Sequence, residues 1–254
     1  MLNYVEYGKE NKYDDDIFFQ KYSQMSRSQQ GLAGAGEWET LRKLLPDFKD
    51  KRVLDLGCGY GWHCIYAMEH GASSVVGVDI SHKMLEVAKE KTHFPQVEYK
   101  CCAIEDVEFP EESFDVILSS LAFHYVADYE ILVKKIYRIL KSGGNLVFTV
   151  EHPVFTAYGT QDWYYNKKGE ILHFPVDNYY YEGKRTAVFL GEKVTKYHRT
   201  LTTYLNTLLS NGFIINHIVE PQPPENMMDI PGMQDEMRRP MMLIVSANKN
   251  CYTI

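Results

Sequence analysis

Apolar residues along the first part of the chain fall into short continuous runs, separated by runs with helical spacing. The continuous runs predict buried strands near residues 52–57, 74–79, 96–102, 113–119 and 144–150. Helical spacing between them predicts helices near residues 61–71, 82–92 and 128–141. Strands that alternate with helices through short loops form a parallel sheet with helices on both faces. Because ligands bind such sheets at the carboxyl ends of the strands, we expect the functional residues along one edge.

The segments before and after this core predict further elements. Residues 14–25 and 37–45 are amphipathic and predict two helices, with a linker of small residues over 27–36. A predicted helix over 201–210 is followed by apolar runs at 213–219 and 241–247, which predict an antiparallel pair that closes the sheet. We therefore expect a single domain made of a helical cover (1–48), a core (49–150), an insertion (151–199) and a closing segment (200–254).

The first predicted strand ends in a glycine turn, Asp55-Leu56-Gly57-Cys58-Gly59-Tyr60-Gly61. Its glycines allow a sharp turn and close approach of the backbone to a ligand, and the helix that follows offers free N–H groups. The dinucleotide fingerprint needs its last glycine one residue later, where Trp62 stands, so this spacing argues against a pyrophosphate. Asp55 beside the turn instead favours a ligand with an ammonium or sulfonium centre.

Asp79 ends the second predicted strand, about 20 residues after the glycine turn, which is the distance that places an acidic residue on a ribose in such folds. A carboxylate at this point can accept hydrogen bonds from both ribose hydroxyls. The alternative is that Asp79 only caps the helix that begins near Ser81. The preceding glycine turn favours the ribose role.

These motifs resemble those of the class I S-adenosylmethionine (SAM)-dependent methyltransferases, in particular type 11-like bacterial enzymes that act on small molecules. The resemblance rests on the glycine turn and Asp79, and continues through Ser81–Leu85, Phe114–Ile117 and Leu140–Gly144. It implies SAM as cofactor, S-adenosylhomocysteine as product, and a Rossmann-like, seven-stranded, mostly parallel sheet with a helical cover and a β-rich insertion after the fifth strand. The cofactor-binding residues that it implies are Asp55, Gly57, Cys58, Gly59, Gly61, Asp79, Ile80, Met84, Ala103, Ile104, Glu105, Ser119, Tyr22 and Arg27.

The third strand end departs from the family pattern. Ala103 stands where the family often has an aspartate that contacts the adenine amino group. The backbone N–H of Ile104 can still bind a ring nitrogen, and Glu105 or Asp106 are the available replacements for the missing side chain.

Residues 151–199 are crowded with aromatic side chains, and their position at the mouth of the site predicts a lid or substrate wall. Alternating apolar residues at 169–174 and 186–190 predict a hairpin or a small antiparallel sheet. For Tyr22 and Trp38, the alternative to ligand contact is packing beneath the helices. For Arg185 and Arg199, the alternative is an internal salt bridge. The residues expected to contact the substrate are Trp38, Tyr181, Arg185, Tyr197, His198 and Arg199.

Methyl transfer from a sulfonium is an in-line displacement, so a base is needed only when the acceptor must lose a proton. We hypothesise that His152, or alternatively His124, is that base, with Glu151 orienting it. His124 as a packed histidine is the competing interpretation. The aromatic insertion suits a quinone or polyketide-like ring, or a cationic amine held by aromatic faces.

The net charge of −7 and the lack of Lys/Arg clusters disfavour a nucleic-acid substrate. The five cysteines lack C-x-x-C spacing, so we expect no metal site, and free thiols indicate a cytoplasmic protein. No apolar run is long enough to span a membrane. A non-catalytic SAM- or S-adenosylhomocysteine-binding protein and an NAD-dependent oxidoreductase are the alternatives, the latter disfavoured by the glycine spacing. The sequence leaves the oligomeric state open.

Overall fold

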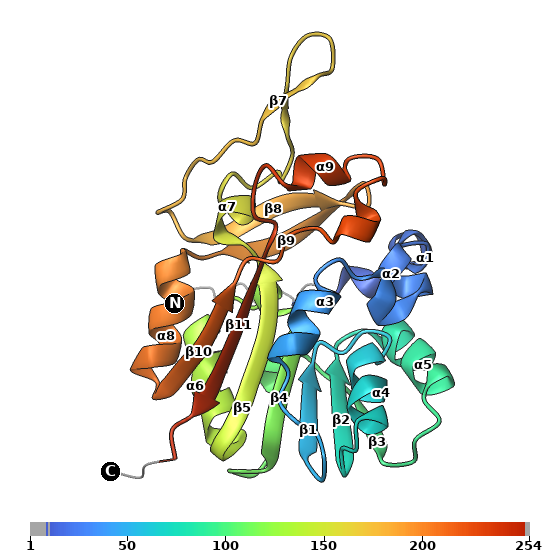
Figure 1. The fold of residues 1–254 in the computed structure, drawn as a ribbon, viewed down its shortest axis with the longest axis vertical. Helices are drawn as coiled ribbons and strands as arrows, with labels where there is room; N and C mark the ends of the chain where they lie inside the picture. The colour runs from blue at the N-terminus through green and yellow to red at the C-terminus, as the bar shows by residue number, and fades with distance from the viewer. Residues whose placement is uncertain (1–8, 10, 252–254) are drawn as a thin grey trace, which may run out of the picture.

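The computed structural model describes residues 9 and 11–251. Its centre is a seven-stranded sheet in the order β10-β11-β5-β4-β1-β2-β3 (Figure 1). β11 runs antiparallel to both of its neighbours, and the other pairs are parallel, so the predicted fold is confirmed. The strands are β1 (Arg52–Leu56), β2 (Ser74–Asp79), β3 (Val97–Cys101), β4 (Phe114–Ser120), β5 (Leu140–Glu151), β10 (Phe213–Val219) and β11 (Met242–Lys249).

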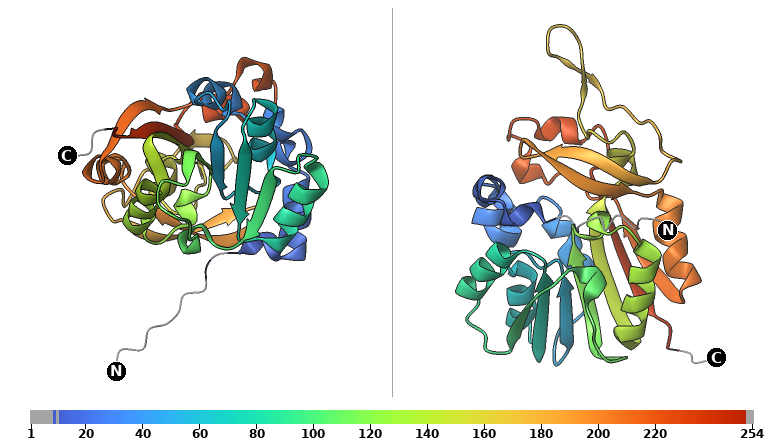
Figure 2. Two further views of the ribbon diagram at one scale, coloured as in Figure 1. Left: turned by 90° about the horizontal axis from the view of Figure 1, so that it is seen from below. Right: turned by 180° about the vertical axis from the view of Figure 1, so that it is seen from behind.

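Helices pack on both faces of this sheet (Figures 1 and 2). α6 (Tyr129–Ile139) and α8 (Leu201–Ser210) share one apolar core with β1, β4 and β5. α4 (Trp62–Glu69), α5 (His82–Lys91) and α3 (Trp38–Leu41) share the core on the opposite face. α6 shows why these helices form where they do: Asp128 caps its first turn through Ile131 N, and its buried residues recur with helical spacing.

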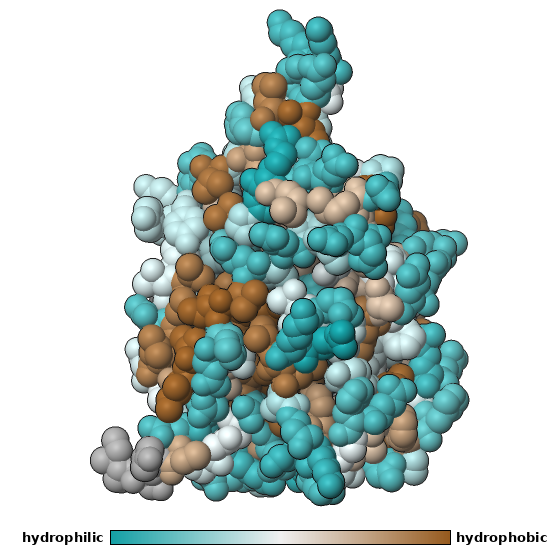
Figure 3. All heavy atoms as spheres, viewed as in Figure 1, coloured by the Kyte–Doolittle hydropathy of each residue, from teal (hydrophilic) through white to brown (hydrophobic). Residues whose placement is uncertain are grey.

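One part of the sheet has no helix in front of it. In the view of Figure 1, β10 and β11 face the reader without a covering helix in the described chain, and Figure 3 shows apolar side chains gathered there. None of the described helices is long and apolar enough to cross a membrane.

The N-terminal cover is more helical than we predicted. It contains η1 (Lys12–Asp14), α1 (Asp16–Ser23), α2 (Ser26–Gln29), η2 (Gly31–Gly34), α3 and η3 (Arg42–Leu44). The linker expected over residues 27–36 is therefore wrong. Its small residues serve close packing, because a Cβ on Gly34 would lie 2.3 Å from the carbonyl oxygen of Ser26.

The insertion after β5 contains two separate hairpins. β6 (Tyr164–Tyr165) pairs with β7 (Ile171–His173), and β8 (Gly183–Phe189) pairs with β9 (Glu192–His198). The two segments that we predicted to be strands thus lie in different hairpins, and β9 was not predicted. Leu190 and Gly191 both have positive φ, which suits the tight turn joining β8 to β9. The remaining short helices are η4 (Ile104–Asp106), η5 (Phe123–Tyr125), α7 (Pro153–Ala157), η6 (Glu225–Met227) and α9 (Met233–Glu236).

Candidate active site

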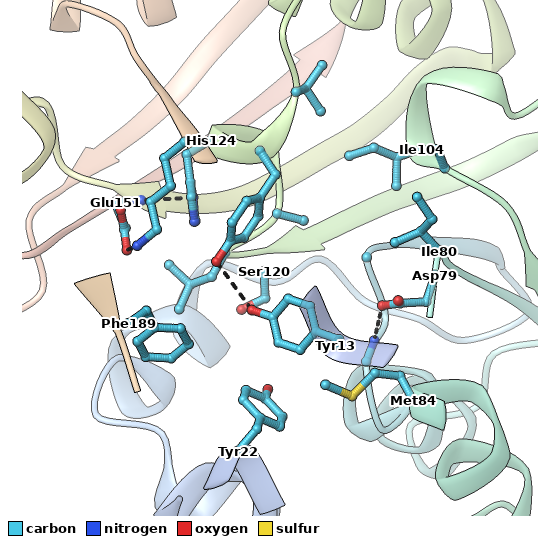
Figure 4. A pocket seen from close by; sticks show the side chains of 18 of the residues that line it. Tyr13, Tyr22, Asp79, Ile80, Met84, Ile104, Ser120, His124, Glu151 and Phe189 are labelled. Atoms are coloured by element: carbon cyan, nitrogen blue, oxygen red, sulfur yellow. Dashed lines mark hydrogen bonds and ion pairs between the residues drawn. The ribbon is translucent and has the colours of Figure 1, made fainter. Parts of the chain in front are cut away.

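A cavity of about 260 Å³ lies at the carboxyl ends of the central strands, beneath the β8–β9 hairpin (Figure 4). Its wall comes from the N-terminal cover, the glycine turn, the ends of β2, β4 and β5, the loops after β3 and β4, the start of α5, the β8–β9 hairpin and the start of β11. A side chamber of about 70 Å³ shares Tyr22, Arg27, Gly57, Gly59 and Ser120 with it. Segments far apart in the sequence therefore meet around one cavity.

The three glycines of the turn differ in their surroundings. Gly57 has φ +78°, and a Cβ there would lie 2.4 Å from the Cβ of Ala122. Gly59 has φ +52°, lines the cavity and has nothing within 4 Å of a Cβ position. Gly61 was expected to contact the cofactor, but it does not line the cavity, and a Cβ there would lie 2.2 Å from the hydroxyl of Tyr99. Gly61 is thus required for packing between α4 and the sheet.

Asp79 lines the cavity and is held by two backbone groups. Its Oδ2 accepts a hydrogen bond from Gly59 N at 2.9 Å, and its Oδ1 accepts one from Ser81 N at 2.9 Å. Because an ionised carboxylate has about four lone-pair positions, two remain for a ligand. This arrangement fits a pair of ribose hydroxyls. Asp79 does not cap α5 itself, because Ser81 is the N-cap, but its bond to Ser81 N supports the start of that helix.

Asp55 lies behind the turn and not in the cavity wall. Its Oδ2 accepts from Cys64 Sγ at 3.4 Å, and its Oδ1 is buried without a partner in the described chain. Burial, with a smaller contribution from Asp79, raises the pKa of Asp55 to about 7. Ser119 is also buried away from the cavity and donates to the carbonyl of Leu56, and Cys58 lines the side chamber only.

The end of the cavity beyond Asp79 is mainly apolar. Ile80, Met84, Ala103 and Ile104 line it together with Glu105. An apolar slot of this kind suits a planar purine base. Of the two replacements considered for the side chain missing at Ala103, Glu105 lines the cavity and Asp106 does not; Asp106 forms an ion pair with Lys9.

The side chamber holds a buried ion pair. Nη2 of Arg27 lies 2.8 and 2.9 Å from the two carboxylate oxygens of Glu37, which is 3% exposed. The remaining donors of Arg27 are free of partners among the described residues, so they can bind a carboxylate. His63 also lines this chamber, and burial lowers its pKa to about 4.

The opposite end of the cavity combines aromatic walls with one polar cluster. Tyr13, Tyr125 and Phe189 line it, and the hydroxyls of Tyr13 and Tyr125 lie 3.3 Å apart. Glu151 forms an ion pair with Lys196 of β9, and Nδ1 of His124 accepts a hydrogen bond from Glu151 N at 3.4 Å. The described residues contain no cluster of side chains suited to bind a metal ion.

Comparison with known proteins agrees with this geometry. The family model described as a methyltransferase domain matches residues 54–148. A crystal structure from Listeria monocytogenes, assigned as an SAM-dependent methyltransferase, is 58% identical, covers 87% of this chain and 99% of that chain, and has a TM-score of 0.83. The SAM-dependent methyltransferase from Mesorhizobium loti is 40% identical, covers 86% and 100%, and has a TM-score of 0.80.

This chain belongs to the SAM-dependent methyltransferases. SAM is its cofactor, as the motifs implied, and when bound it supplies a methyl group on an electrophilic sulfonium. Asp79 fits the ribose, and the apolar slot fits the adenine. Arg27 fits the methionine carboxylate, and the glycine turn lets the backbone approach the cofactor closely. Ubiquinone biosynthesis O-methyltransferase of Coxiella burnetii is 35% identical over 112 residues, which are 43% of this chain and 47% of that protein. The chain thus spans about half the length of that relative.

In this methyltransferase, the structure separates the two residues that we paired as base and orienting group. Successive side chains at the end of β5 point to opposite sides, so Glu151 faces the cavity and His152 does not. His152 Nδ1 accepts from Val154 N at the start of α7, and its Nε2 lies 2.9 Å from Glu220 Oε1. Glu151 therefore does not orient His152, and His124 is the expected histidine that reaches the cavity.

The residues expected to contact the substrate also lie outside the cavity wall. Arg199 donates to the carbonyls of Phe123, Val126 and Ala127, and His198 lies between Thr156 Oγ1 and the carbonyl of Tyr179. Arg185 donates to the carbonyls of Ala157, Asn178 and Tyr181, whose own side chain is 75% exposed. The partners of both arginines are carbonyl oxygens, not the carboxylates expected in the salt-bridge alternative. Tyr197 does not line the cavity, and Trp38 packs on Tyr66 at 4.7 Å, as its packing alternative proposed.

Sequence reasoning missed Lys196 and Tyr13, and it counted Phe189 only among the aromatic residues of the insertion. A signal for Lys196 was available, because Val194, Lys196 and His198 alternate along one strand face and all are buried. A lysine on the buried face of an amphipathic strand indicates a specific partner.

Proposed function

We propose that this methyltransferase transfers the methyl group of SAM to a small molecule with an apolar or aromatic body, bound beneath the β8–β9 hairpin. The observation that supports this proposal most directly is the cavity that runs from Asp79 to Glu151 under the N-terminal cover and the hairpin. A cavity of about 260 Å³ suits a small molecule better than a polymer.

The charges around the cavity support the same class of acceptor. The cations in its described wall are Lys9, Arg27 and Lys196, and each is ion-paired with a carboxylate. A nucleic-acid substrate would need a continuous basic groove. The name of the Coxiella relative, an O-methyltransferase of ubiquinone biosynthesis, also points to a small molecule.

The chain's own contribution to the reaction is alignment and exclusion of water. Asp79 and Arg27 fix the two ends of the cofactor on one side of the cavity, and Tyr13, Tyr125 and Phe189 confine the acceptor on the other side. Because the cover, core, insertion and closing segment all supply wall residues, we propose that they act as one domain. The five cysteines are free thiols, which favours the reducing environment of the cytoplasm.

The test is incubation of the purified protein with methyl-labelled SAM and a metabolite extract, followed by mass spectrometry. Transfer of label to a metabolite, and its loss in an Asp79→Asn variant, is the expected result. Binding of SAM by calorimetry without label transfer to any metabolite would instead support a non-catalytic SAM-binding protein. Label recovered in RNA, DNA or protein would contradict the small-molecule proposal.

A further inference from the structure

The polar cluster at the acceptor end contains a buried ion pair inside an aromatic wall. The side chains of Lys196 and Glu151 are 3% and 12% exposed. Removing two charges from water can cost more than their attraction returns, so a buried ion pair is weak evidence for a role in stability. Both residues line the cavity, and this position suggests a role toward the acceptor.

The protein accepts hydrogen bonds from only some of the N–H groups of Lys196. Its ammonium donates to Glu151 Oε1 and to Gln161 Oε1, the latter at 2.8 Å. Gln161 Nε2 in turn donates to Glu151 Oε2, so both carboxylate oxygens are engaged. An ammonium has three N–H groups, and the described residues accept from two of them. The third remains for a ligand in the cavity.

Two aromatic rings nearby already form cation–π contacts with this lysine. Its Nζ lies 5.5 Å from the ring centroid of Phe189 and 6.0 Å from that of Tyr125. These are the rings that would otherwise receive a cationic substrate. A second cation here would be repelled by Lys196, and the negative charge of Glu151 is already balanced by that ammonium. The cluster therefore disfavours a cationic amine as acceptor.

His124 supplies a second donor. Its Nδ1 accepts from Glu151 N, so in the neutral ring the proton lies on Nε2. Burial lowers the pKa of His124 to about 4, against the opposing influence of Glu151, so the ring is neutral at pH 7. Figure 4 shows the ring beside Glu151 and directed toward the cavity. In this tautomer Nε2 donates a hydrogen bond and cannot accept the acceptor's proton.

We propose that Lys196 and His124 form an oxyanion-binding site that selects acceptors carrying an acidic oxygen, namely a phenol, enol or carboxylic acid, on an apolar body. This inference rests on the proposed function. The acceptor's O–H bond breaks first, and its proton leaves to the solvent. An oxygen lone pair then forms the O–C bond as the C–S bond breaks. The anion and the sulfonium thereby give a neutral methyl ether or ester and neutral S-adenosylhomocysteine.

The test uses 4-nitrophenol, whose phenolate absorbs visible light, bound to the protein saturated with S-adenosylhomocysteine. Since a nearby cation favours the charged form of an acid, the bound probe should have a pKa about one unit below that of the free probe. Lys196→Met should abolish this shift. Lys196→Arg should retain at least part of it, because it keeps the charge. The matched control is Lys193→Met, an exposed lysine on the same strand, which should leave the shift unchanged.

A purely structural role for Lys196 would lower the melting temperature without changing the pKa of the bound probe. An equal pKa in the wild-type protein and Lys196→Met, or no probe binding to the wild-type complex, overturns the inference. A second measurement needs no variant: the wild-type complex should bind benzoate about tenfold more tightly than benzylammonium, and the reverse order overturns the inference. Absence of SAM binding or of label transfer in the wild-type protein is a separate result, and it would contradict the proposed function itself.

Discussion

Replacing Asp79 by asparagine tests where the nucleoside binds. The carboxylate accepts from Gly59 N and Ser81 N at 2.9 Å each, and it keeps two lone-pair positions for the ribose. Asparagine removes the negative charge and has an NH₂ group in place of one carboxylate oxygen. This donor would face a backbone N–H group, which is also a donor. Hydrogen bonds to charged groups contribute about 1.5–3 kcal/mol each, so loss of one ribose bond should weaken SAM binding by about 10- to 100-fold.

Isothermal titration calorimetry with SAM and with S-adenosylhomocysteine measures this effect. The control is Asp106→Asn, whose carboxylate is 60% exposed and pairs with Lys9 at the rim. We expect the control to bind both ligands as the wild-type protein does. The folding of Asp79→Asn should be nearly unaffected, because burial raises the pKa of Asp79 and removal of that buried charge offsets the lost bonds. A Kd within twofold of wild type in Asp79→Asn would show that the nucleoside does not bind at the end of β2.

Three further predictions concern the scaffold. Gly57→Ala should lower the free energy of unfolding, measured with urea, more than Gly59→Ala does. Both positions have positive φ, but only at position 57 would the new Cβ lie 2.4 Å from the Cβ of Ala122. Equal losses of stability in the two variants would contradict this. Burial raises the pKa of Asp55 from 3.8 to about 7, so the folded protein keeps a proton that the unfolded chain releases, and its stability falls as pH rises between these values. Asp55→Asn should remove this part of the slope in urea midpoints between pH 4 and 7, and an unchanged slope would refute the assignment. Phe18 is fully buried between the cover and the β8–β9 hairpin. Phe18→Ala should therefore lower the free energy of unfolding by about 3 kcal/mol and make the cover sensitive to limited proteolysis. If the variant resists proteolysis as the wild-type protein does, the cover is held by other contacts.

The sequence by itself determined the order of strands and helices in the core, the glycine turn and the position of Asp79 at the end of β2. Each of these depends on neighbouring residues: alternating runs define strands and helices, and a strand that ends in glycines next to a helix forms the same turn wherever it occurs. Because carboxyl ends of parallel strands meet at one edge, the local patterns also predicted the edge of the sheet at which the cofactor binds. Gly61 shows the limit of this reasoning, since only packing against Tyr99 reveals what that glycine does.

Only the tertiary structure decided the acceptor end of the site. Glu151 and His152 are adjacent in sequence, yet the alternation of strand side chains sends them to opposite sides, and the surroundings decide which side is the cavity. Lys196 lies 45 residues from Glu151, and only the packing of β9 against the segments beside the end of β5 brings its ammonium to that carboxylate. Local patterns carry no information about such long-range contacts, because they arise when separately folded segments pack together around the same space.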